Sequence, residues 1–219
     1  LVGRGPPAAI REEPKMSGTV SPLAPKSHPE LPALEGVRFA TAAAGIKYKG
    51  RTDVLLVALD EGTEVAGVFT TSKCPSAPVD WCRANLPAGR ARALMVNSGN
   101  ANAATGETGL ACARETCSIA SQVIGCEPQQ ILVASTGVIG QILPIDTFET
   151  AIPAAYEALS AHGGADAARA IMTTDTHSKE YAVSYVSEAA GHAGNVYSVG
   201  GMCKGSGMIM PNMATMIAV

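Results

Sequence analysis

The sequence predicts a layered α/β protein, because segments typical of strands and of helices alternate along it and several strands are joined by short turns. Of its 219 residues, 47% are hydrophobic and 16% are charged, which is typical of a globular protein and allows one large or two small domains. Only 4% are aromatic. We therefore expect a core of Ala, Val, Ile, Leu and Met, with tight turns and close packing of small residues.

The beginning of the chain differs from the rest in composition. Residues 1–16 are rich in proline and charge and have no apolar periodicity, so we expect them to be a leader or cloning remnant and to be disordered. Residues 17–219 then form the structured part. Within it, the repeated prolines of residues 17–32 predict an extended arm on the surface.

Residues typical of strands dominate the next part of the sequence. Residues 53–59 (DVLLVAL) and 64–70 (EVAGVFT) flank the turn-like DEGT and predict a hairpin. Residues 91–97 (ARALMVN) predict a buried strand that leads into a polar loop at residues 98–109, and loops at strand ends are common ligand sites. Three asparagines are expected to stabilise turns rather than contact a ligand: Asn97, Asn100 and Asn102.

A helix and a short strand are predicted next. Apolar residues recur three and four positions apart between Leu110 and Ile124, which indicates an amphipathic helix that covers a sheet and ends near Gly125. Residues 131–134 predict a short strand that runs into the loop STGVIG (135–140).

A second helix is predicted around residue 152. Asp146 and Glu149 have the spacing of a capping box at its start. Pro153 conflicts with that early start, so we expect the helix to kink there or to begin later. The glycine pair at 163–164 is expected to end it. The apolar residues that mark this helix are Phe148, Ile152, Tyr156 and Leu159.

The last part of the sequence predicts strands. Residues 180–187 and 194–199 are rich in β-branched and aromatic residues and predict a strand pair. Residues 215–219 predict a further strand that is cut short where the sequence stops. Together with the predicted helices, these strands complete the layered α/β arrangement.

The charge and composition argue against several classes of partner. The net charge is -3, the pI is about 5.8, and Lys and Arg are scattered, so neither nucleic acid nor an anionic membrane is an expected partner. No apolar run approaches the roughly 18 residues of a membrane-spanning helix, and the first residues lack the apolar region of a signal peptide. We therefore expect a cytoplasmic protein that binds small molecules.

The six cysteines and four histidines do not have the spacing of a metal site. No two cysteines form a CxxC pair, and the histidines are dispersed along the chain. We expect reduced, mostly buried thiols and no metal.

Thr215 lies between a glycine-rich apolar loop and the last predicted strand. The simpler interpretation is structural, because a β-branched residue suits the start of a strand. In the alternative hypothesis, the Thr215 hydroxyl attacks the Ala214 carbonyl, and hydrolysis of the resulting ester leaves Thr215 as a new N-terminus. Its α-amine, with a pKa of about 7.7–8, would then accept the proton of its own hydroxyl. Gly205, Gly207 and Ala214 would help the strained peptide to reach this geometry.

The segment ASTGVIG (134–140) has two interpretations of nearly equal weight. It is either a turn whose backbone N–H groups bind any anion, including a phosphate, or part of a catalytic site. In the catalytic interpretation, the Thr136 hydroxyl and the Gly137 N–H form an oxyanion hole.

Lys204 and the segment MTTDT (172–176) are further candidates for substrate contacts. Lys204 is the only Lys or Arg after Lys179, and glycines flank it on both sides. It is either a solvated lysine or the partner of a substrate carboxylate. The sequence around it does not satisfy the Walker motif, so we reject a nucleotide-binding loop. MTTDT is either a turn at a helix C-terminus or a substrate contact through Thr173 or Thr174.

Five segments between residues 37 and 219 resemble the amino-terminal half of ornithine acetyltransferase, also called the bifunctional glutamate N-acetyltransferase of arginine biosynthesis. Each segment alone is weak evidence, but together and in this order they are specific. The resemblance implies an αββα sandwich, with two sheets packed between helices as in other self-processing, aminopeptidase-like enzymes, and it implies no metal or nucleotide cofactor. The segments are RFATAAAGIKYKGRTD, VNSGNANAATG, ASTGVIG, MTTDT and GGMCKGSGMIMPNMATM.

The resemblance also implies a reaction and a set of site residues. Members of the family cleave themselves at the bond that corresponds to Ala214–Thr215. The freed Thr215 then takes acetyl from N-acetylornithine, releases ornithine and passes the acetyl group to glutamate, and some members also accept acetyl-CoA. Thr136 and Gly137 match the oxyanion-hole pair of the family. Thr173, Lys204 and Thr215 match its substrate-contacting positions.

In the family that the sequence resembles, each enzyme unit consists of an α chain and a β chain from one precursor. Only four residues follow Thr215 here, so we expect this chain to be the α-chain part and the β chain to be its partner in a hetero-oligomer. Two alternatives stay open. One is an aminopeptidase or amidase on the same scaffold, in which water rather than an amine resolves the acyl-enzyme. The other is a binding module that holds an anion at STGVIG and leaves Thr215 inert.

Overall fold

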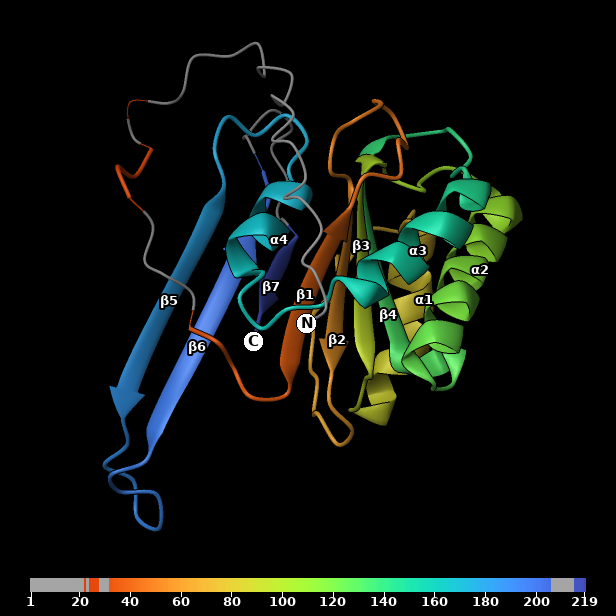
Figure 1. The fold of residues 1–219 in the computed structure, drawn as a ribbon. Coiled ribbons are helices and arrows are strands. Elements are labelled where there is room, and N and C mark those ends of the chain that lie inside the picture. Colours follow the sequence, from red (N-terminus) through yellow and green to blue (C-terminus); the bar gives the residue numbers. More distant parts are fainter. Residues whose placement is uncertain (1–21, 23, 28–31, 206–214) are drawn as a thin grey trace, which may run out of the picture.

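Two β-sheets lie face to face in the computed structural model, which describes residues 22, 24–27, 32–205 and 215–219 (Figure 1). The larger sheet has the order β1-β2-β3-β4. β2 pairs antiparallel with both β1 and β3, whereas β3 and β4 are parallel. The bounds are Val37–Ala42 for β1, Val54–Leu59 for β2, Ala93–Asn100 for β3 and Ile131–Val138 for β4.

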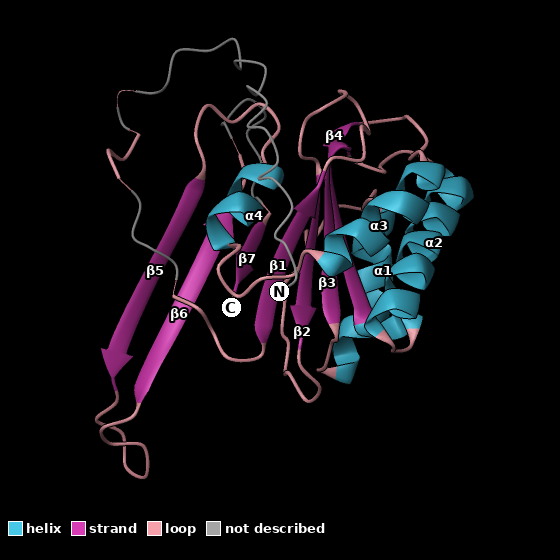
Figure 2. Cartoon of the chain, in the orientation of Figure 1, coloured by secondary structure: helices cyan, strands magenta, loops and turns pink. Residues whose placement is uncertain are grey.

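The smaller sheet is antiparallel and has the order β5-β6-β7. β5 and β6 form a long hairpin, and β7 adds three residues at the edge of β6 (Figure 2). The predicted strand pair and the predicted last strand are therefore confirmed, with small shifts of their ends. The bounds are Lys179–Val186 for β5, Val196–Cys203 for β6 and Met216–Ala218 for β7.

Helices cover the face of the larger sheet that points away from β5-β6-β7 (Figure 1). These are α1 (Ala77–Asn85), α2 (Gly106–Ile124) and α3 (Phe148–Glu157). α4 (Gly164–Ala170) lies on the other face, where its alanines share an apolar cluster with both sheets. Short 3-10 helices precede β3, β4 and α3 at Leu86–Ala88 (η1), Pro128–Gln130 (η2) and Ile145–Thr147 (η3).

The sequence of β2 explains why it lies at the centre of the layers. All six residues of VLLVAL are buried. Alternate side chains point to opposite faces of a strand, so Val54 and Leu56 pack in the helix-side core while Leu55 and Val57 pack in the core between the sheets. A strand with two apolar faces has to lie between two layers. The predicted layered α/β arrangement is confirmed, and the described residues contain its helix, sheet and sheet layers in that order.

The predicted hairpin of residues 53–59 and 64–70 is wrong. β2 pairs with β1 and β3, and residue 64 makes only an isolated bridge to Arg90. Val68 is 81% exposed. β1 contributes Ala40 to the helix-side core and Phe39 to the core between the sheets, whereas the segment that includes Val68 is exposed.

The predicted helix boundaries near residues 146–164 also need correction. Thr147 is in the αR region and makes no side-chain cap, because η3 runs directly into α3, so the Asp146 and Glu149 capping box does not form. α3 begins at Phe148 and continues through Pro153 rather than beginning later. α3 already ends at Glu157, and Gly163 and Gly164 stand at the start of α4 instead of ending a helix. Gly163 packs closely there, because a Cβ on it would lie 2.8 Å from Phe39 Cβ.

Several expectations fall on residues that the structure does not describe. These include the leader at residues 1–16, most of the arm at 17–32, and Ala214 and Gly207 near the last strand. Within the described part of the chain, no helix has the length and apolar character needed to cross a membrane.

We predict that Phe148→Ala lowers the free energy of unfolding by about 3–5 kcal/mol, because Phe148 is fully buried between the helices and the larger sheet and its removal leaves a cavity. Urea denaturation followed by circular dichroism measures the change. Val68→Ala, at an exposed position, is the control and should alter it by no more than about 0.5 kcal/mol. Equal effects of the two substitutions would contradict the assignment of the core.

Candidate active site

Strand ends from both sheets meet at one end of the molecule. β3, β4 and β6 finish there, and β5 and β7 begin there (Figure 1). The five predicted site residues lie on these strand ends or on the segments that lead to them: Thr136, Gly137, Thr173, Lys204 and Thr215. Residues far apart in the sequence therefore share one end of the layers.

Two glycine backbones touch at the end of β3 and β4. Gly99 and Gly137 are partners in the parallel register, next to the pair Ser98 and Thr136. Gly137 has φ +141°, and a Cβ built on it would lie 2.2 Å from the Gly99 carbonyl carbon. Only glycine fits such an approach and such a backbone conformation. The structure thus corrects the predicted end of this strand: β4 continues to Val138, so Thr136 and Gly137 lie in the strand, paired with β3, and not in a loop that begins at Ser135.

Buried asparagines fix the polar loop that follows β3. The Asn97 amide oxygen accepts a hydrogen bond of 2.6 Å from the Ser135 hydroxyl, and its nitrogen donates to the Asn100 carbonyl at 2.8 Å. The Asn100 side-chain oxygen in turn accepts from the Asn102 N–H at 2.7 Å. The bond between Asn100 and Asn102 fits the predicted role in a turn, but Asn97 and Asn100 themselves lie in β3, which extends past the predicted strand end at Asn97.

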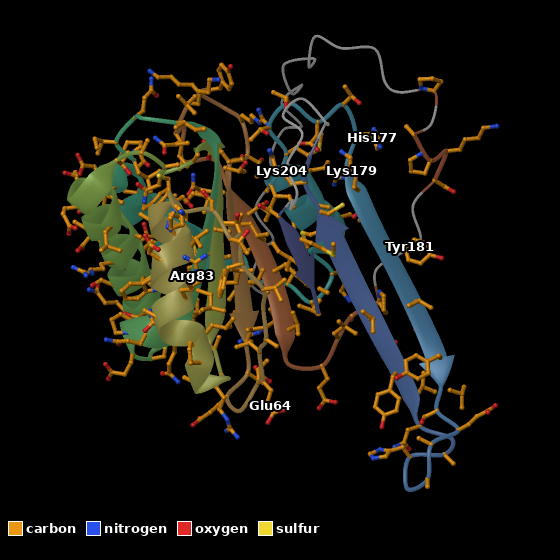
Figure 3. The ribbon with its side chains drawn as sticks, turned by 180° about the vertical axis from the view of Figure 1, so that it is seen from behind. Glu64, Arg83, His177, Lys179, Tyr181 and Lys204 are labelled. Carbon is orange, nitrogen blue, oxygen red and sulfur yellow. The ribbon has the colours of Figure 1, made fainter. Side chains whose placement is uncertain are left out.

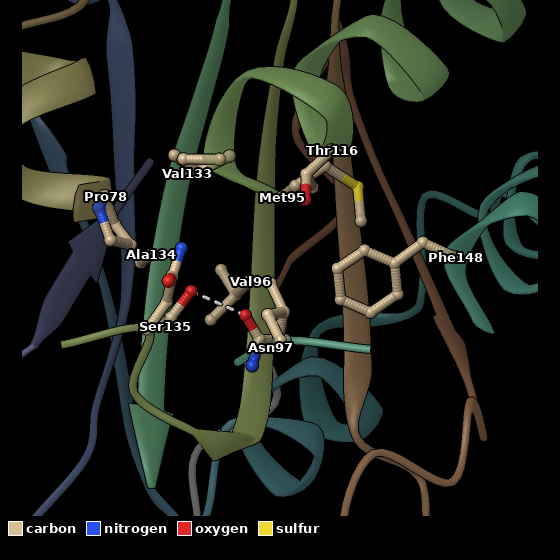
Figure 4. A pocket seen from close by; sticks show the side chains of 12 residues that line it. Pro78, Met95, Val96, Asn97, Thr116, Val133, Ala134, Ser135 and Phe148 are labelled. Atoms are coloured by element: carbon tan, nitrogen blue, oxygen red, sulfur yellow. Dashed lines mark hydrogen bonds between the residues drawn. The ribbon is translucent and has the colours of Figure 1, made fainter. Parts of the chain in front are cut away.

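A small pocket lies beneath this loop, between the larger sheet and its helices (Figure 4). The hydrogen bond between Asn97 and Ser135 lines it, but most of its walls are apolar, as at Met95 and Phe148. Its lining includes no charged residue. A charged amino acid would therefore bind poorly in this pocket, and its walls belong to the packing that supports the loop.

Asp175 joins three chain segments at the other sheet. Its carboxylate accepts hydrogen bonds from Lys179 Nζ at 2.7 Å, from the Gly205 N–H at 2.7 Å and from the Thr173 N–H at 3.1 Å. Only 1% of its surface is exposed. Burial opposes the charge, but the hydrogen bonds from Lys179, Gly205 and Thr173 outweigh it and hold the pKa of Asp175 below its ordinary value.

Thr215 lies directly beside Lys204. The Lys204 N–H donates to the Thr215 carbonyl at 3.0 Å, and the next residues continue as the β6–β7 ladder. Burial lowers the pKa of the Lys204 ammonium, Asp175 opposes that effect, and Lys179 adds to it. Lys204 and Lys179 lie at the same end of the smaller sheet (Figure 3).

The segment from α4 to Asp175 connects this group with the larger sheet. The Ser98 hydroxyl donates to the Ala170 carbonyl at 2.8 Å, and the Arg51 guanidinium donates to the Met172 carbonyl. Ser98 is the register partner of Thr136. Asp175 therefore joins Thr173 to Gly205, the residue after Lys204, and Lys204 is bonded in turn to Thr215. The bonds from Ser98 and Arg51 connect this group with the larger sheet, whose strand β3 pairs with Thr136 and Gly137.

A buried carboxylate also anchors the loop of residues 43–51. Asp53, 3% exposed, accepts hydrogen bonds of 2.7 Å from the N–H groups of Ala44 and Ile46. Burial raises the pKa of the Asp53 carboxyl group, although these N–H groups act against the shift. Lys47 in this loop packs against Gly99, whose Cβ would lie 3.1 Å from the Lys47 Cβ. The loop thus forms one wall beside the glycine pair.

The sequence interpretation missed the supporting residues Asp175, Lys179, Ser98, Arg51 and Asp53 as parts of the site. Two of these residues could have been recognised as structurally important from the sequence. Asp53 is an acidic residue at the start of an otherwise apolar buried strand, and Asp175 precedes Lys179 by four residues. Their partners at Gly205 and Ala44 could not be inferred from that spacing, because they come from other loops.

The cysteines and other potential metal ligands are dispersed. Within the described ranges, no three His, Cys, Asp or Glu side chains come together as a metal site. Cys82, Cys112 and Cys117 are buried free thiols, and burial raises the pKa of each of them. Cys126 and Cys203 are partly exposed and Cys74 is exposed, so the expected burial of the thiols holds for three of the six.

The sequence model of the ArgJ family matches residues 38–219. The chain belongs to the ArgJ family. The match includes all five predicted site residues, and the resemblance inferred from the five sequence segments is therefore confirmed.

Curated ArgJ relatives match nearly the whole chain but extend well beyond it. The arginine biosynthesis bifunctional protein ArgJ of Bradyrhizobium diazoefficiens is 53% identical over 203 residues, and that of Agrobacterium fabrum is 54% identical over 203 residues. In both cases the alignment covers 93% of this chain and 48% of the relative. The chain thus spans about half the length of these ArgJ proteins.

Solved structures give the same family and fold. Ornithine acetyltransferase from Mycobacterium tuberculosis, in complex with ornithine, is 35% identical with a TM-score of 0.74, and the match covers 84% of this chain and 94% of that one. ArgJ from Bacillus halodurans is 30% identical with a TM-score of 0.72, covering 84% and 92%. This ArgJ chain therefore has the α/β sandwich fold of these enzymes, as the sequence predicted.

We predict that Gly137→Ala destabilises the protein by about 1–3 kcal/mol from backbone strain and that the clash with Gly99 adds to this loss. Gly140→Ala, in the segment just after β4, is the control, since Gly140 also has a positive φ but no atom within 4 Å of an added Cβ. Urea denaturation of both variants compares the losses. If the two variants lose equal stability, the close approach of Gly99 does not constrain this end of β4.

Proposed function

We propose that this chain is the nucleophile-bearing half of a cytoplasmic glutamate N-acetyltransferase that moves acetyl from N-acetylornithine to glutamate in arginine biosynthesis. The observation that carries the proposal is the position of Thr215, whose carbonyl is hydrogen-bonded to Lys204 at the strand ends where Thr173 is also held. Family membership supports the reaction class. The free thiols suit a reducing compartment.

The proposed maturation step releases the amine of Thr215. The Thr215 hydroxyl adds to the Ala214 carbonyl, the C–N bond breaks, and an ester forms between the two residues. Water then hydrolyses the ester, which leaves a carboxylate on Ala214 and a free α-amine on Thr215. A comparison of lengths supports this cleavage. The match covers 94% of the solved chain from M. tuberculosis but only 48% of the curated ArgJ protein, so that solved chain is about as long as the matched half.

In the proposed transfer step, Thr215 acts as nucleophile and base. Its hydroxyl attacks the acetyl carbonyl of N-acetylornithine while its α-amine takes the proton. The Thr136 hydroxyl and the Gly137 N–H stabilise the oxyanion of the tetrahedral intermediate. The intermediate collapses to acetyl-threonine and ornithine, which leaves with the proton. The amine of glutamate then attacks the ester and regenerates Thr215.

Substrate binding follows from the charges at the smaller sheet. Lys204 is half-buried, and within the described residues its ammonium has no hydrogen-bond partner, whereas Lys179 is paired with Asp175. We propose that Lys204 pairs with the substrate carboxylate and that Thr173 adds a hydrogen bond. Acetyl-CoA as a second acetyl donor fits the same chemistry, because it also presents an acyl carbonyl. The proposed steps involve no metal or other cofactor.

The proposed partner is a β chain from the same precursor, which would make the enzyme a hetero-oligomer. The outer face of β5-β6-β7 presents large apolar side chains to solvent, with exposed fractions of 68% at Tyr181, 55% at Tyr185 and 75% at Met216. An αββα sandwich places helices on that face. The half of the ArgJ relatives that lies outside this alignment is long enough to supply them.

We predict that Thr215→Ala in the full-length gene product abolishes both self-cleavage and acetyl transfer, because the variant lacks the attacking hydroxyl. Intact-mass spectrometry shows whether the chain is whole or cleaved into two fragments. Thr215→Ser, which keeps a hydroxyl, is the matched control and should still cleave. Two mature-sized chains from Thr215→Ala would refute the mechanism, and release of free acetate instead of acetylglutamate from the wild type would favour the amidase alternative.

We predict that Thr136→Val lowers kcat by about 10²–10³ with little change in KM, because the hydroxyl is proposed to act only on the charge of the tetrahedral intermediate. Steady-state kinetics with N-acetylornithine and glutamate measure the change. Thr150→Val, at an exposed position of α3, is the control and should keep wild-type rates. Wild-type turnover of Thr136→Val would eliminate its role in the oxyanion hole.

A further inference from the structure

Asp175 is a buried carboxylate whose partners come from three parts of the chain. Thr173 lies in the turn after α4, Lys179 begins β5, and Gly205 follows the end of β6. Gly205 is 30 residues away in sequence. A carboxylate that is 1% exposed loses its contact with water, so these three donors have to replace it, and their positions are fixed together.

The two carboxylate oxygens of Asp175 accept hydrogen bonds from different donors. Oδ1 accepts from Lys179 Nζ and from the Gly205 N–H, both at 2.7 Å, and Oδ2 accepts from the Thr173 N–H at 3.1 Å. An asparagine has only one acceptor oxygen, so it cannot keep all three bonds. Either its NH₂ group would face the N–H of Thr173, or it would face Lys179 and Gly205.

Asp175 forms an ion pair with one of two neighbouring lysines and not with the other. Lys179 is bound to Asp175 in an ion pair at 2.7 Å, whereas Lys204 makes no such pair within the described residues. Because no ion pair within the described residues occupies the Lys204 ammonium, a substrate carboxylate can pair with it. Lys204 is connected to Thr215 by the hydrogen bond between its N–H and the Thr215 carbonyl.

We propose that Asp175 is a positioning residue of this site: by holding the backbone at Thr173 and Gly205 and by pairing with Lys179, it leaves Lys204 to bind the substrate carboxylate beside Thr215. The inference rests on the proposed function for its kinetic consequences. Its structural part, the fixing of two backbone amides by one carboxylate, does not depend on the reaction.

The kinetic test compares Asp175→Asn with Asp166→Asn in the full-length gene product. Asp166 forms an exposed pair with Arg169 on α4 and controls for the loss of one carboxylate. We expect Asp175→Asn to raise KM for N-acetylornithine and to lower kcat, each by about 10- to 100-fold, the effect of losing hydrogen bonds to a charged group. Asp166→Asn should keep wild-type values. Wild-type kcat and KM in Asp175→Asn would overturn the proposal.

A double variant distinguishes positioning from simple charge balance. If Asp175 served only to neutralise Lys179, then Lys179→Met would restore the activity of Asp175→Asn. We expect the double variant to stay impaired, because the bonds to Thr173 and Gly205 are still altered. Full rescue would overturn the positioning role.

Hydrogen exchange tests the positioning independently of acetyl transfer. In Asp175→Asn, the amides of Thr173 and Gly205 should exchange about 10-fold faster or more than in the wild type, while amides of α2 keep their protection. Unchanged exchange at both amides would overturn the proposal even if activity falls. If the wild-type enzyme does not transfer acetyl groups, the proposed function is refuted, but the exchange rates of these two amides still test the positioning role of Asp175. Should Asp175→Asn not fold, Asp175→Glu, which keeps the charge but displaces it, takes its place in both measurements.

Discussion

The apolar contact between the two sheets is the interaction on which the arrangement of this molecule depends. Met202 and Ile217 of the smaller sheet lie in one buried cluster with Leu55 and Val57 of the larger sheet. Their burial stabilises the layers through the hydrophobic effect, and it fixes how far the two sets of strand ends lie from each other. The site residues follow these strands, so their positions are a consequence of that packing.

Buried polar contacts then fix the chain segments at the strand ends, where apolar packing stops. Asp53 binds the loop beside Gly99, Ser98 binds the end of α4, and Asp175 binds the start of β5 and the end of β6. Each of these groups is almost fully buried, so breaking its hydrogen bonds would leave an unsatisfied polar group without water. Such bonds are directional, which makes them suited to hold backbone groups in one geometry.

The two halves of the site differ in how they are constrained. At Gly137 the constraint is steric, because the backbone of Gly99 leaves no room for a side chain. At Lys204 and Thr215 it is electrostatic, because Asp175 holds the neighbouring Gly205 N–H. The proposed acetyl transfer uses both, since an oxyanion hole needs donors at a fixed distance and a substrate carboxylate needs a cation that is not already paired.

The sequence by itself determined the elements whose signal is local. Apolar residues three and four apart gave the helix that ends at Gly125, and the apolar runs gave β2, β3, β4 and the β5–β6 pair. The motifs around Thr136, Thr173, Lys204 and Thr215 identified the family, because each motif is a short contiguous string.

Only the tertiary structure decided which segments meet. β1 rather than residues 64–70 became the partner of β2, and β1 adds the buried Phe39 and Ala40 to the two cores, whereas Val68 is exposed. Gly163 stands at the start of α4, where close packing against Phe39 leaves no room for a side chain. Asp175 connects to Gly205 across 30 residues. Such contacts depend on packing between distant segments, and periodicity along the sequence contains no information about them.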